Sequence, residues 1–264
     1  MKISFIGGGN IASAIIGGIT KDNYISKTDI SVYDINSSVY DKYSEAGFNA
    51  VKTTEEAFMS DIIFLTIKPQ FYPDVLSGMG KLQDKLIVTV APGITVSTVK
   101  GYLDKSCKVI RTMPNTPLMV GEGMTVIASS DEVEKEKYDF VKSLFEKSGR
   151  VAIIEEELID SAIAVSGSSP AYIYMMIDAL KKGGMEKGID EETSLFLAAQ
   201  AVYGSAKMVM ETKIAPSTLK DMVCSPNGTT IRAVNDLEKN NFEEIIIHAM
   251  NECYLRAKEM QEGK

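Results

Sequence analysis

Histidine and cysteine are scarce in this chain of 264 residues, which has one histidine, His248, and three cysteines, Cys107, Cys224 and Cys253. The cysteines are odd in number and widely spaced, so they provide neither a CxxC redox pair nor a zinc-binding quartet. His248 stands in an apolar stretch, which favours a buried or half-buried helix position over catalysis. The sequence therefore predicts reduced thiols, no metal site and chemistry without histidine.

Long apolar runs and clustered positive charge are also missing. No segment approaches eighteen uninterrupted apolar residues, and the first residues already form a strand pattern. We therefore expect neither a membrane span nor a signal peptide, and a cytoplasmic location. The formal net charge is −8, which argues against a nucleic-acid surface because such a surface needs gathered Lys and Arg.

The first half of the chain alternates short β-branched runs with helical stretches. This pattern predicts a doubly wound parallel sheet. After residues 151–154 the strand signals stop, and apolar residues recur at spacings of three and four. We expect an α/β Rossmann-like domain over residues 1–154 and an all-α domain over residues 155–264. The expected strands after the first are residues 30–34, 62–67, 86–91, 109–111, 124–128 and 151–154.

A glycine motif follows the first strand. In Gly7-x-Gly9-x-x-Ala12 the first glycine allows a tight turn, the second lets a pyrophosphate approach the backbone, and the third position needs a small residue for helix packing. The strand before the motif and the helix after it predict a dinucleotide site. Its expected cofactor contacts are Gly7, Gly9, Asn10 and Ile11.

Asp34 ends the second strand, where an acidic side chain usually binds the adenosine ribose. No basic residue follows through Ser38, which favours NADH over NADPH. The alternative is an acidic turn residue exposed to solvent.

Further candidates follow buried strands at the carboxyl edge of the predicted sheet, where open α/β proteins bind ligands. They are Thr66, Lys68 and Pro69 after one strand, Ala91 and Gly93 after the next, and Asn115 between two prolines. Each has an alternative: Lys68 as a solvated lysine, and the other loops as structural turns.

The segment Ser225-Pro226-Asn227-Gly228-Thr229-Thr230 predicts a second anion site. A turn made by Pro and Gly follows a short helix at residues 219–224 and leaves Gly228, Thr229 and Thr230 at the start of the next helix. The free N–H groups there suit a carboxylate. The alternative is an ordinary helix cap.

Taken together, these motifs resemble the pyrroline-5-carboxylate reductase family over essentially the whole chain. The resemblance rests on residues 5–12, on Lys68-Pro69-Gln70, on residues 109–117, on Ser166-Gly167-Ser168-Ser169-Pro170-Ala171-Tyr172 and on residues 219–230. Three positions depart from the family pattern: Pro92 where alanine is common, and Ser169 and Asn227 where glycine is usual.

The resemblance implies reduction of the cyclic imine 1-pyrroline-5-carboxylate to L-proline with NADPH or NADH. It implies that residues 155–264 bind substrate and form a homodimer or higher homo-oligomer. The substrate carboxylate would contact Ser225, Gly228, Thr229 and Thr230, and Thr230 would also act in catalysis near the ring nitrogen. A protonated imine needs little acid help, so catalysis would be mostly positioning and electrostatics.

Two other interpretations remain. A β-hydroxyacid dehydrogenase has a similar layout but uses a lysine from the helical domain, for which Lys181 and Lys182 are candidates. A regulatory relative could bind NAD(P)H without turnover, which the departures at Ser169 and Asn227 would allow.

Overall fold

The structure is a computed structural model that describes residues 1–128, 130 and 132–262; the last two residues of the predicted 155–264 domain lie outside this part. The chain forms two compact units. Unit 1 contains Met1–Ser168 and the residues from Cys253 onward, and unit 2 is Ser169–Glu252. The compact units therefore divide later than residue 154, and the end of the chain belongs to the first unit.

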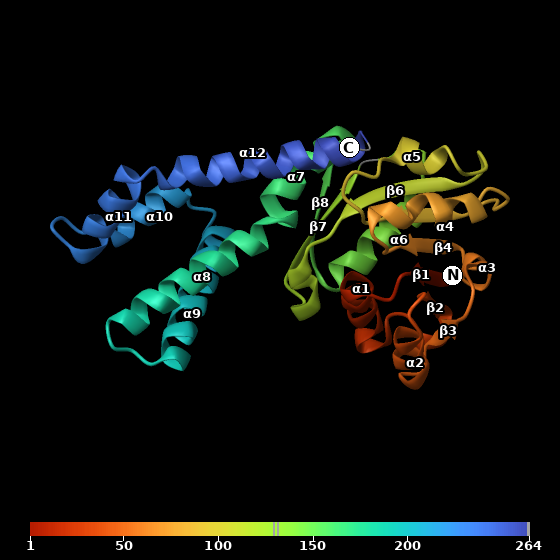
Figure 1. The fold of residues 1–264 in the computed structure, drawn as a ribbon, viewed down its shortest axis with the longest axis horizontal. Coiled ribbons are helices and arrows are strands. Elements are labelled where there is room, and N and C mark those ends of the chain that lie inside the picture. Colours follow the sequence, from red (N-terminus) through yellow and green to blue (C-terminus); the bar gives the residue numbers. More distant parts are fainter. Residues whose placement is uncertain (129, 131, 263–264) are drawn as a thin grey trace. The chain divides into compact units, whose positions relative to one another are not determined.

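Unit 1 is built on an 8-stranded sheet with the order β3-β2-β1-β4-β5-β6-β7-β8 (Figure 1). The predicted doubly wound α/β fold is confirmed. Neighbouring strands are parallel except β6 and β7. The strands are β1 (Ile3–Ile6), β2 (Ile30–Tyr33), β3 (Asn49–Val51), β4 (Ile62–Leu65), β5 (Leu86–Thr89), β6 (Lys108–Met113), β7 (Gly123–Ala128) and β8 (Gly149–Ile154).

Two features of the sheet differ from the sequence prediction. The edge strand β3 was not predicted, and β7 runs antiparallel to β6. Only residues 114–122 connect β6 to β7, and they contain the short 3-10 turn Thr116–Val120. A parallel crossover needs about a dozen residues or more, so this short connection returns the chain in the opposite direction.

Alternate strand residues face the two sides of the sheet and form two apolar clusters. Ile3, Phe5 and Phe64 pack with α1 (Asn10–Thr20), α2 (Ser37–Glu45) and α6 (Lys135–Glu146). Ile6, Ile63 and Leu65 pack on the other side with α3 (Thr54–Phe58), α4 (Tyr72–Gly78) and α5 (Val96–Lys100). The strands are buried on both faces, as a parallel sheet requires. Burying each large apolar side chain contributes roughly 1.5–3 kcal/mol.

The segment after β8 packs with the sheet. It contains α7 (Ile159–Ala162) and a π-helical turn at Ile163–Gly167. Ile159 and Ile163 are buried in a third cluster with Met113 and Val126, and Ala257 from the last helix joins them. This burial explains why unit 1 extends to Ser168 and includes the end of the chain.

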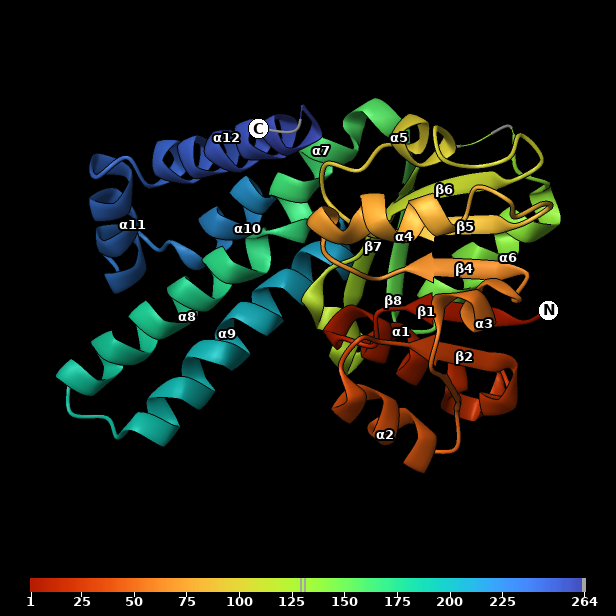
Figure 2. The same ribbon diagram turned by 45° about the vertical axis from the view of Figure 1, so that its right-hand side comes forward.

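Unit 2 is helical, as predicted. Its helices are α8 (Ser169–Glu186), α9 (Glu191–Thr212), α10 (Pro216–Val223), α11 (Thr229–Lys239) and the first part of α12 (Phe242–Gln261). The helices α8 and α9 lie side by side in both views (Figures 1 and 2). They approach closely at Gly184, where a Cβ would lie 2.8 Å from the Ser194 hydroxyl.

Large apolar side chains of unit 2 remain exposed in the single chain. Met175, Phe196 and Met222 are each about two-thirds exposed or more. His248 is also exposed rather than buried or half-buried as expected, because unit 2 has little interior of its own in a single copy. Among the described residues, no helix is both long enough and apolar enough to span a bilayer.

Candidate active site

The glycine turn between β1 and α1 needs glycine for three different reasons. Gly7 has a φ of 99°, and a Cβ there would lie 2.7 Å from the Thr66 carbonyl oxygen. A Cβ on Gly8 would lie 2.5 Å from Val39. A Cβ on Gly9, by contrast, would have no atom of the described chain within 4 Å, leaving aside its chain neighbours and the backbone of its own helix. The first two glycines allow the turn to form, and the third leaves open space in front of it.

The start of α1 faces that space. Gly9 is the N-cap residue of α1, and no described side chain forms a capping hydrogen bond there. The first turn of α1 contains no acidic residue. The first N–H groups of a helix lack partners within the helix and carry partial positive charge. This end of α1, with Asn10 and Ile11 as its first residues, fits a pyrophosphate.

Asp34 holds the glycine turn beside the end of β2. Its Oδ2 accepts a hydrogen bond from Gly8 N at 2.8 Å, and its Oδ1 accepts one from Asn36 N at 2.9 Å. Tyr43 supports the same turn, since its hydroxyl donates to the Gly8 carbonyl at 3.3 Å. Burial raises the pKa of Tyr43, and the nearby Asp34 charge raises it further although Ser13 opposes the shift. Tyr43 therefore stays neutral and able to donate.

A cleft of about 530 Å³ opens at this edge of unit 1. It lies where the strand order changes direction, between β1 and β4, which is where open α/β sheets bind ligands. The structure brings five predicted cofactor residues together in its lining: Gly7, Gly9, Asp34, Thr66 and Lys68. The lining also includes side chains that the sequence did not indicate: Ile35, Glu55, Phe71, Asp74 and Val75.

Thr66 and Lys68 follow β4 in different roles. The Thr66 hydroxyl donates to the Gly7 carbonyl at 2.6 Å, so it supports the turn that faces the cofactor space. Lys68 precedes the 3-10 turn Pro69–Phe71 and lines the cleft. Lys68 is the single basic side chain among these lining residues, which places one positive charge beside the glycine turn.

The remaining predicted cofactor residues have structural explanations of their own. Ala91 is buried. Gly93 has a φ of 73°, and a Cβ there would lie 2.8 Å from Met260 Cβ, so its glycine lets the end of α12 pack closely. The Asn115 amide donates to the Ser166 carbonyl at 3.0 Å and its oxygen accepts from Met124 N at 2.9 Å. Cofactor contacts by Pro69, Ala91, Gly93 and Asn115 stay predictions.

The segment Ser166-Gly167-Ser168-Ser169-Pro170-Ala171-Tyr172, which carries part of the family resemblance, spans the end of a wide helical turn and the start of α8. The π-helical turn ends at Gly167, where Ser168 N bonds to the Ile163 carbonyl at 2.8 Å, and Pro170 lies in the first turn of α8. Pro is tolerated there because the first N–H groups of a helix lack partners within it. π-helical turns occur frequently at functional sites.

Within unit 2, loop 225–230 leads into α11 as the sequence predicted. Asn227 has a φ of 59°, the left-handed conformation for which glycine is usual. Gly228 caps α11, and a Cβ there would lie 2.4 Å from the Ser225 hydroxyl. Ser225 and Thr229 are exposed and Thr230 is half-buried. No acidic side chain lies in the first turn of α11, and none of the described side chains caps it, so its N–H groups suit a carboxylate.

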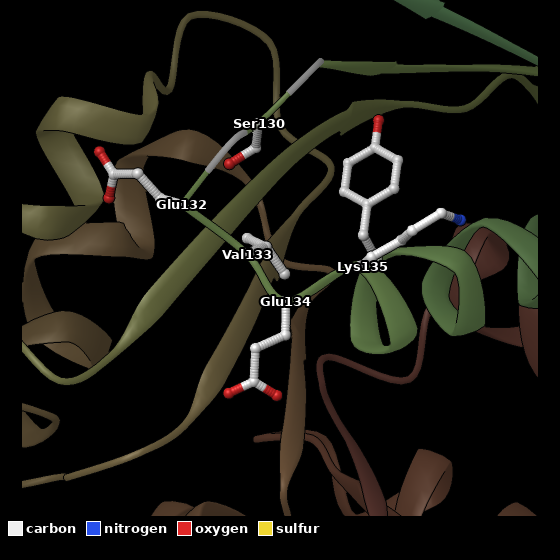
Figure 3. A pocket seen from close by; sticks show the side chains of 6 residues that line it. Ser130, Glu132, Val133, Glu134 and Lys135 are labelled. Carbon is white, nitrogen blue, oxygen red and sulfur yellow. The ribbon is translucent and has the colours of Figure 1, made fainter.

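A different hollow of about 550 Å³ lies beside the connection between β7 and α6 (Figure 3). Because β7 is antiparallel to β6, this connection leaves the sheet at the edge opposite the glycine turn. The side chains of Glu132 and Glu134 point in different directions (Figure 3), and Glu132 is paired with Lys100. None of the predicted site residues lines this hollow.

Comparison with known proteins agrees with this arrangement. Residues 156–260 match the family model for pyrroline-5-carboxylate reductase dimerisation, and residues 2–93 match the model for NADP oxidoreductase coenzyme F420-dependent. The chain is 39% identical to pyrroline-5-carboxylate reductase of Escherichia coli over 99% of both chains. It is 36% identical to human pyrroline-5-carboxylate reductase 2 over 99% of this chain and 84% of the human protein.

Solved structures give the same result. A pyrroline-5-carboxylate reductase from Coxiella burnetii superposes with a TM-score of 0.88 at 32% identity, covering 98% of both chains. The Plasmodium falciparum enzyme, solved with NADP bound, has a TM-score of 0.90 at 30% identity and covers 99% of this chain and 98% of its own.

Proposed function

Because the chain belongs to the pyrroline-5-carboxylate reductase family, we propose that it reduces 1-pyrroline-5-carboxylate to L-proline with a hydride from NADH or NADPH. The observation that carries the proposal is a pair of helix starts without acidic residues, at α1 in unit 1 and α11 in unit 2. The first suits the pyrophosphate of a dinucleotide and the second suits the carboxylate of the imine.

Hydride reduction of a protonated cyclic imine needs few catalytic side chains. When bound, the dihydronicotinamide would supply a hydride to the imine carbon. The substrate nitrogen, protonated before the transfer, would receive the C=N π electrons and keep its proton in the secondary amine of the product. Loop 225–230 would orient the imine through Ser225 and the N–H groups of Gly228 and Thr229. Thr230 is the proposed catalytic residue, since its hydroxyl can donate to the carboxylate while its oxygen accepts a hydrogen bond from the protonated ring nitrogen. Fixed donors of this kind act mainly by positioning and electrostatics.

A lysine-dependent dehydrogenase fits the structure less well. Lys181 forms ion pairs with Asp178 at 3.1 Å and with Glu191 at 3.3 Å, and Lys182 pairs with Asp178 at 2.6 Å. The hydrogen bond with Asp178, followed by that with Glu191, raises the pKa of Lys181. A raised pKa keeps the amine protonated and makes it a poor base. The departure at Asn227 also leaves the loop intact, which weakens the case for a relative without turnover.

Unit 2 would join two copies of the chain. It lies entirely within the match to the dimerisation model, and it exposes Met175, Phe196 and Met222. Large apolar side chains left exposed on one helical unit are typical of association sites. A cytoplasmic location is the accompanying proposal, supported by the free thiols of Cys107, Cys224 and Cys253, the state maintained in reducing compartments. Cell fractionation with an antibody to the chain checks this location.

Steady-state kinetics test the proposed reaction. Oxidation of NADH or NADPH is followed with 1-pyrroline-5-carboxylate. Reduction of NAD⁺ or NADP⁺ is followed in parallel with a series of β-hydroxyacids. We expect turnover with the imine alone. Turnover with a hydroxyacid would support the dehydrogenase, and cofactor binding with no turnover of any substrate would support a sensing role.

A further inference from the structure

We propose that the turn between β2 and α2 selects NADH over NADPH as the hydride donor. The inference rests on the proposed function for the identity of the cofactor site. It concerns the place where the two cofactors differ, which is a hydroxyl or a phosphate on the 2′ carbon of the adenosine ribose. In this fold that carbon lies at the end of the second strand, here at Asp34.

Four hydrogen-bond donors of this turn and the adjoining glycine turn already bond to the side chains of Asp34 and Asn36. Asp34 accepts from Gly8 N at 2.8 Å and from Asn36 N at 2.9 Å. The Asn36 side-chain oxygen accepts from Ser38 N at 3.1 Å and from the Ser38 hydroxyl at 2.9 Å. A 2′-phosphate needs donors, and it would have to displace Asp34 or Asn36 to reach these four.

The same turn offers acceptors to a hydroxyl. An ionised carboxylate has about four lone-pair positions, and Asp34 uses one on each oxygen for the backbone. A ribose hydroxyl can donate to a remaining position without disturbing either bond. The turn therefore fits the 2′-hydroxyl of NADH as it stands.

The net negative charge of the cleft lining also favours NADH over NADPH. Three carboxylates line it, from Asp34, Glu55 and Asp74, against one ammonium from Lys68. Glu55 is in the first turn of α3, which follows β3, the parallel neighbour of β2, so it lies at the same edge as Asp34. A phosphate monoester carries about −1.5 to −2 charge near neutral pH, so these groups repel it.

The nearby lysines Lys52 and Lys42 contact Tyr40 and Ser13. Lys52 lies over the Tyr40 ring, 5.6 Å from its centre, and does not line the cleft. Lys42 donates to the Ser13 hydroxyl at 3.1 Å.

Two exposed apolar side chains, Ile35 and Phe71, also line the cleft and would contact either cofactor. Ile35 is 94% exposed and Phe71 is 50% exposed, and both line the cleft. An aromatic or aliphatic surface can stack against adenine, which is identical in NADH and NADPH. A change at Phe71 should therefore weaken both cofactors equally, which makes it the reference variant for a test of selectivity.

The test measures dissociation constants by fluorescence of the bound dihydronicotinamide at fixed ionic strength, without imine. The full-length protein is compared with Asp34→Asn, Glu55→Gln, Phe71→Ala and Asp29→Asn. We expect NADH to bind at least ten-fold more tightly than NADPH. Asp34→Asn should reduce the ratio of the NADPH to the NADH dissociation constant by ten-fold or more. Glu55→Gln should reduce this ratio by a smaller factor and leave the turn between β2 and α2 unchanged. Phe71→Ala should weaken both cofactors alike, and Asp29→Asn, an exposed acid outside the cleft, should change neither.

Adenosine 5′-monophosphate and adenosine 2′,5′-bisphosphate provide a second readout as competitors of NADH. The monophosphate should compete better with the wild-type protein, and Asp34→Asn should reverse or remove the difference. Equal or tighter binding of NADPH by the wild-type protein overturns the inference, and so does a ratio that neither Asp34→Asn nor Glu55→Gln changes. A preserved NADH preference without imine reduction overturns the proposed function alone, whereas imine reduction with NADPH preferred overturns the inference alone.

Discussion

Arg111 and Asp160 form a buried ion pair in unit 1, with Arg111 Nη2 and Asp160 Oδ1 2.5 Å apart and both side chains at most 2% exposed. Lys258 adds a second contact to Asp160 at 3.2 Å, and Glu156 lies 3.8 Å from Arg111. The Arg111 Nε has no hydrogen-bond partner among the described residues. Removing one member of such a pair leaves a buried charge without compensation.

We expect Asp160→Ala to lower the free energy of unfolding by about 3 kcal/mol, because Arg111 would stay buried without its main partner. Urea unfolding followed by circular dichroism measures the change. Glu146→Ala is the matched control, since it breaks an exposed pair with Lys142 and should cost less than about 1 kcal/mol. If both variants lose the same free energy of unfolding, the buried pair contributes no more to stability than the exposed pair does.

Gly9→Ala and Gly7→Ala should separate folding from cofactor binding. A methyl group on Gly9 meets open space where the pyrophosphate would lie, so this variant should keep its Tm and bind NADH at least about ten-fold more weakly, a loss of about 1.4 kcal/mol. Gly7→Ala places a Cβ on a backbone with positive φ and against the Thr66 carbonyl. It should therefore lower the Tm.

Calorimetry gives the Tm and fluorescence titration gives the affinity of each glycine variant. A Gly9→Ala protein that binds NADH normally would place the pyrophosphate elsewhere.

Thr230→Ala should lower kcat/KM for the imine by ten-fold or more, about 1.4 kcal/mol for a lost hydrogen bond to a charged ligand. The affinity for NADH should stay nearly unchanged. Thr230→Ser keeps the hydroxyl and should retain most activity. If the alanine variant keeps the wild-type kcat/KM, or loses imine and cofactor binding equally, loop 225–230 is only a helix cap.

Phe196→Glu should weaken the oligomer. Phe196 is 68% exposed on α9 of unit 2, and burying a phenylalanine contributes roughly 1.5–3 kcal/mol. We expect the dissociation constant of the oligomer to rise by ten-fold or more in light scattering over a dilution series. Met59→Glu changes a similarly exposed apolar residue of unit 1 and should leave assembly intact. Equal effects of both substitutions would argue against unit 2 as the interface.

Local patterns predicted much of the fold. The glycine turn, Asp34 at the end of β2 and the start of α11 at Thr229 all depend on residues close together in sequence. The strand β3 escaped prediction because it is short, lies at the sheet edge and begins with an exposed asparagine. The direction of β7 escaped because alternation indicates a strand but not its orientation.

The sequence predicted the backbone turns of the site better than it predicted the side chains that line the cleft. Gly7 and Gly9 are fixed by the turn that they make, whereas Ile35 and Phe71 are exposed apolar residues in connecting segments, where no periodicity indicates a role. The bond between Gly8 and Asp34 joins positions 26 residues apart. Contacts of this kind depend on how the strands pair, which the sequence pattern alone does not specify.

The last helix belongs to both units, since α12 starts in unit 2 and its residues from Cys253 onward belong to unit 1. Unit 2 is therefore an insertion in the chain of unit 1. During synthesis the ribosome makes all of unit 2 before it makes Ala257, Lys258 and Met260, which contact the third cluster, Asp160 and Gly93. A nascent chain that stops at Ser168 would leave these contacts open, so unit 1 can complete its folding only after the helices of unit 2 have left the ribosome.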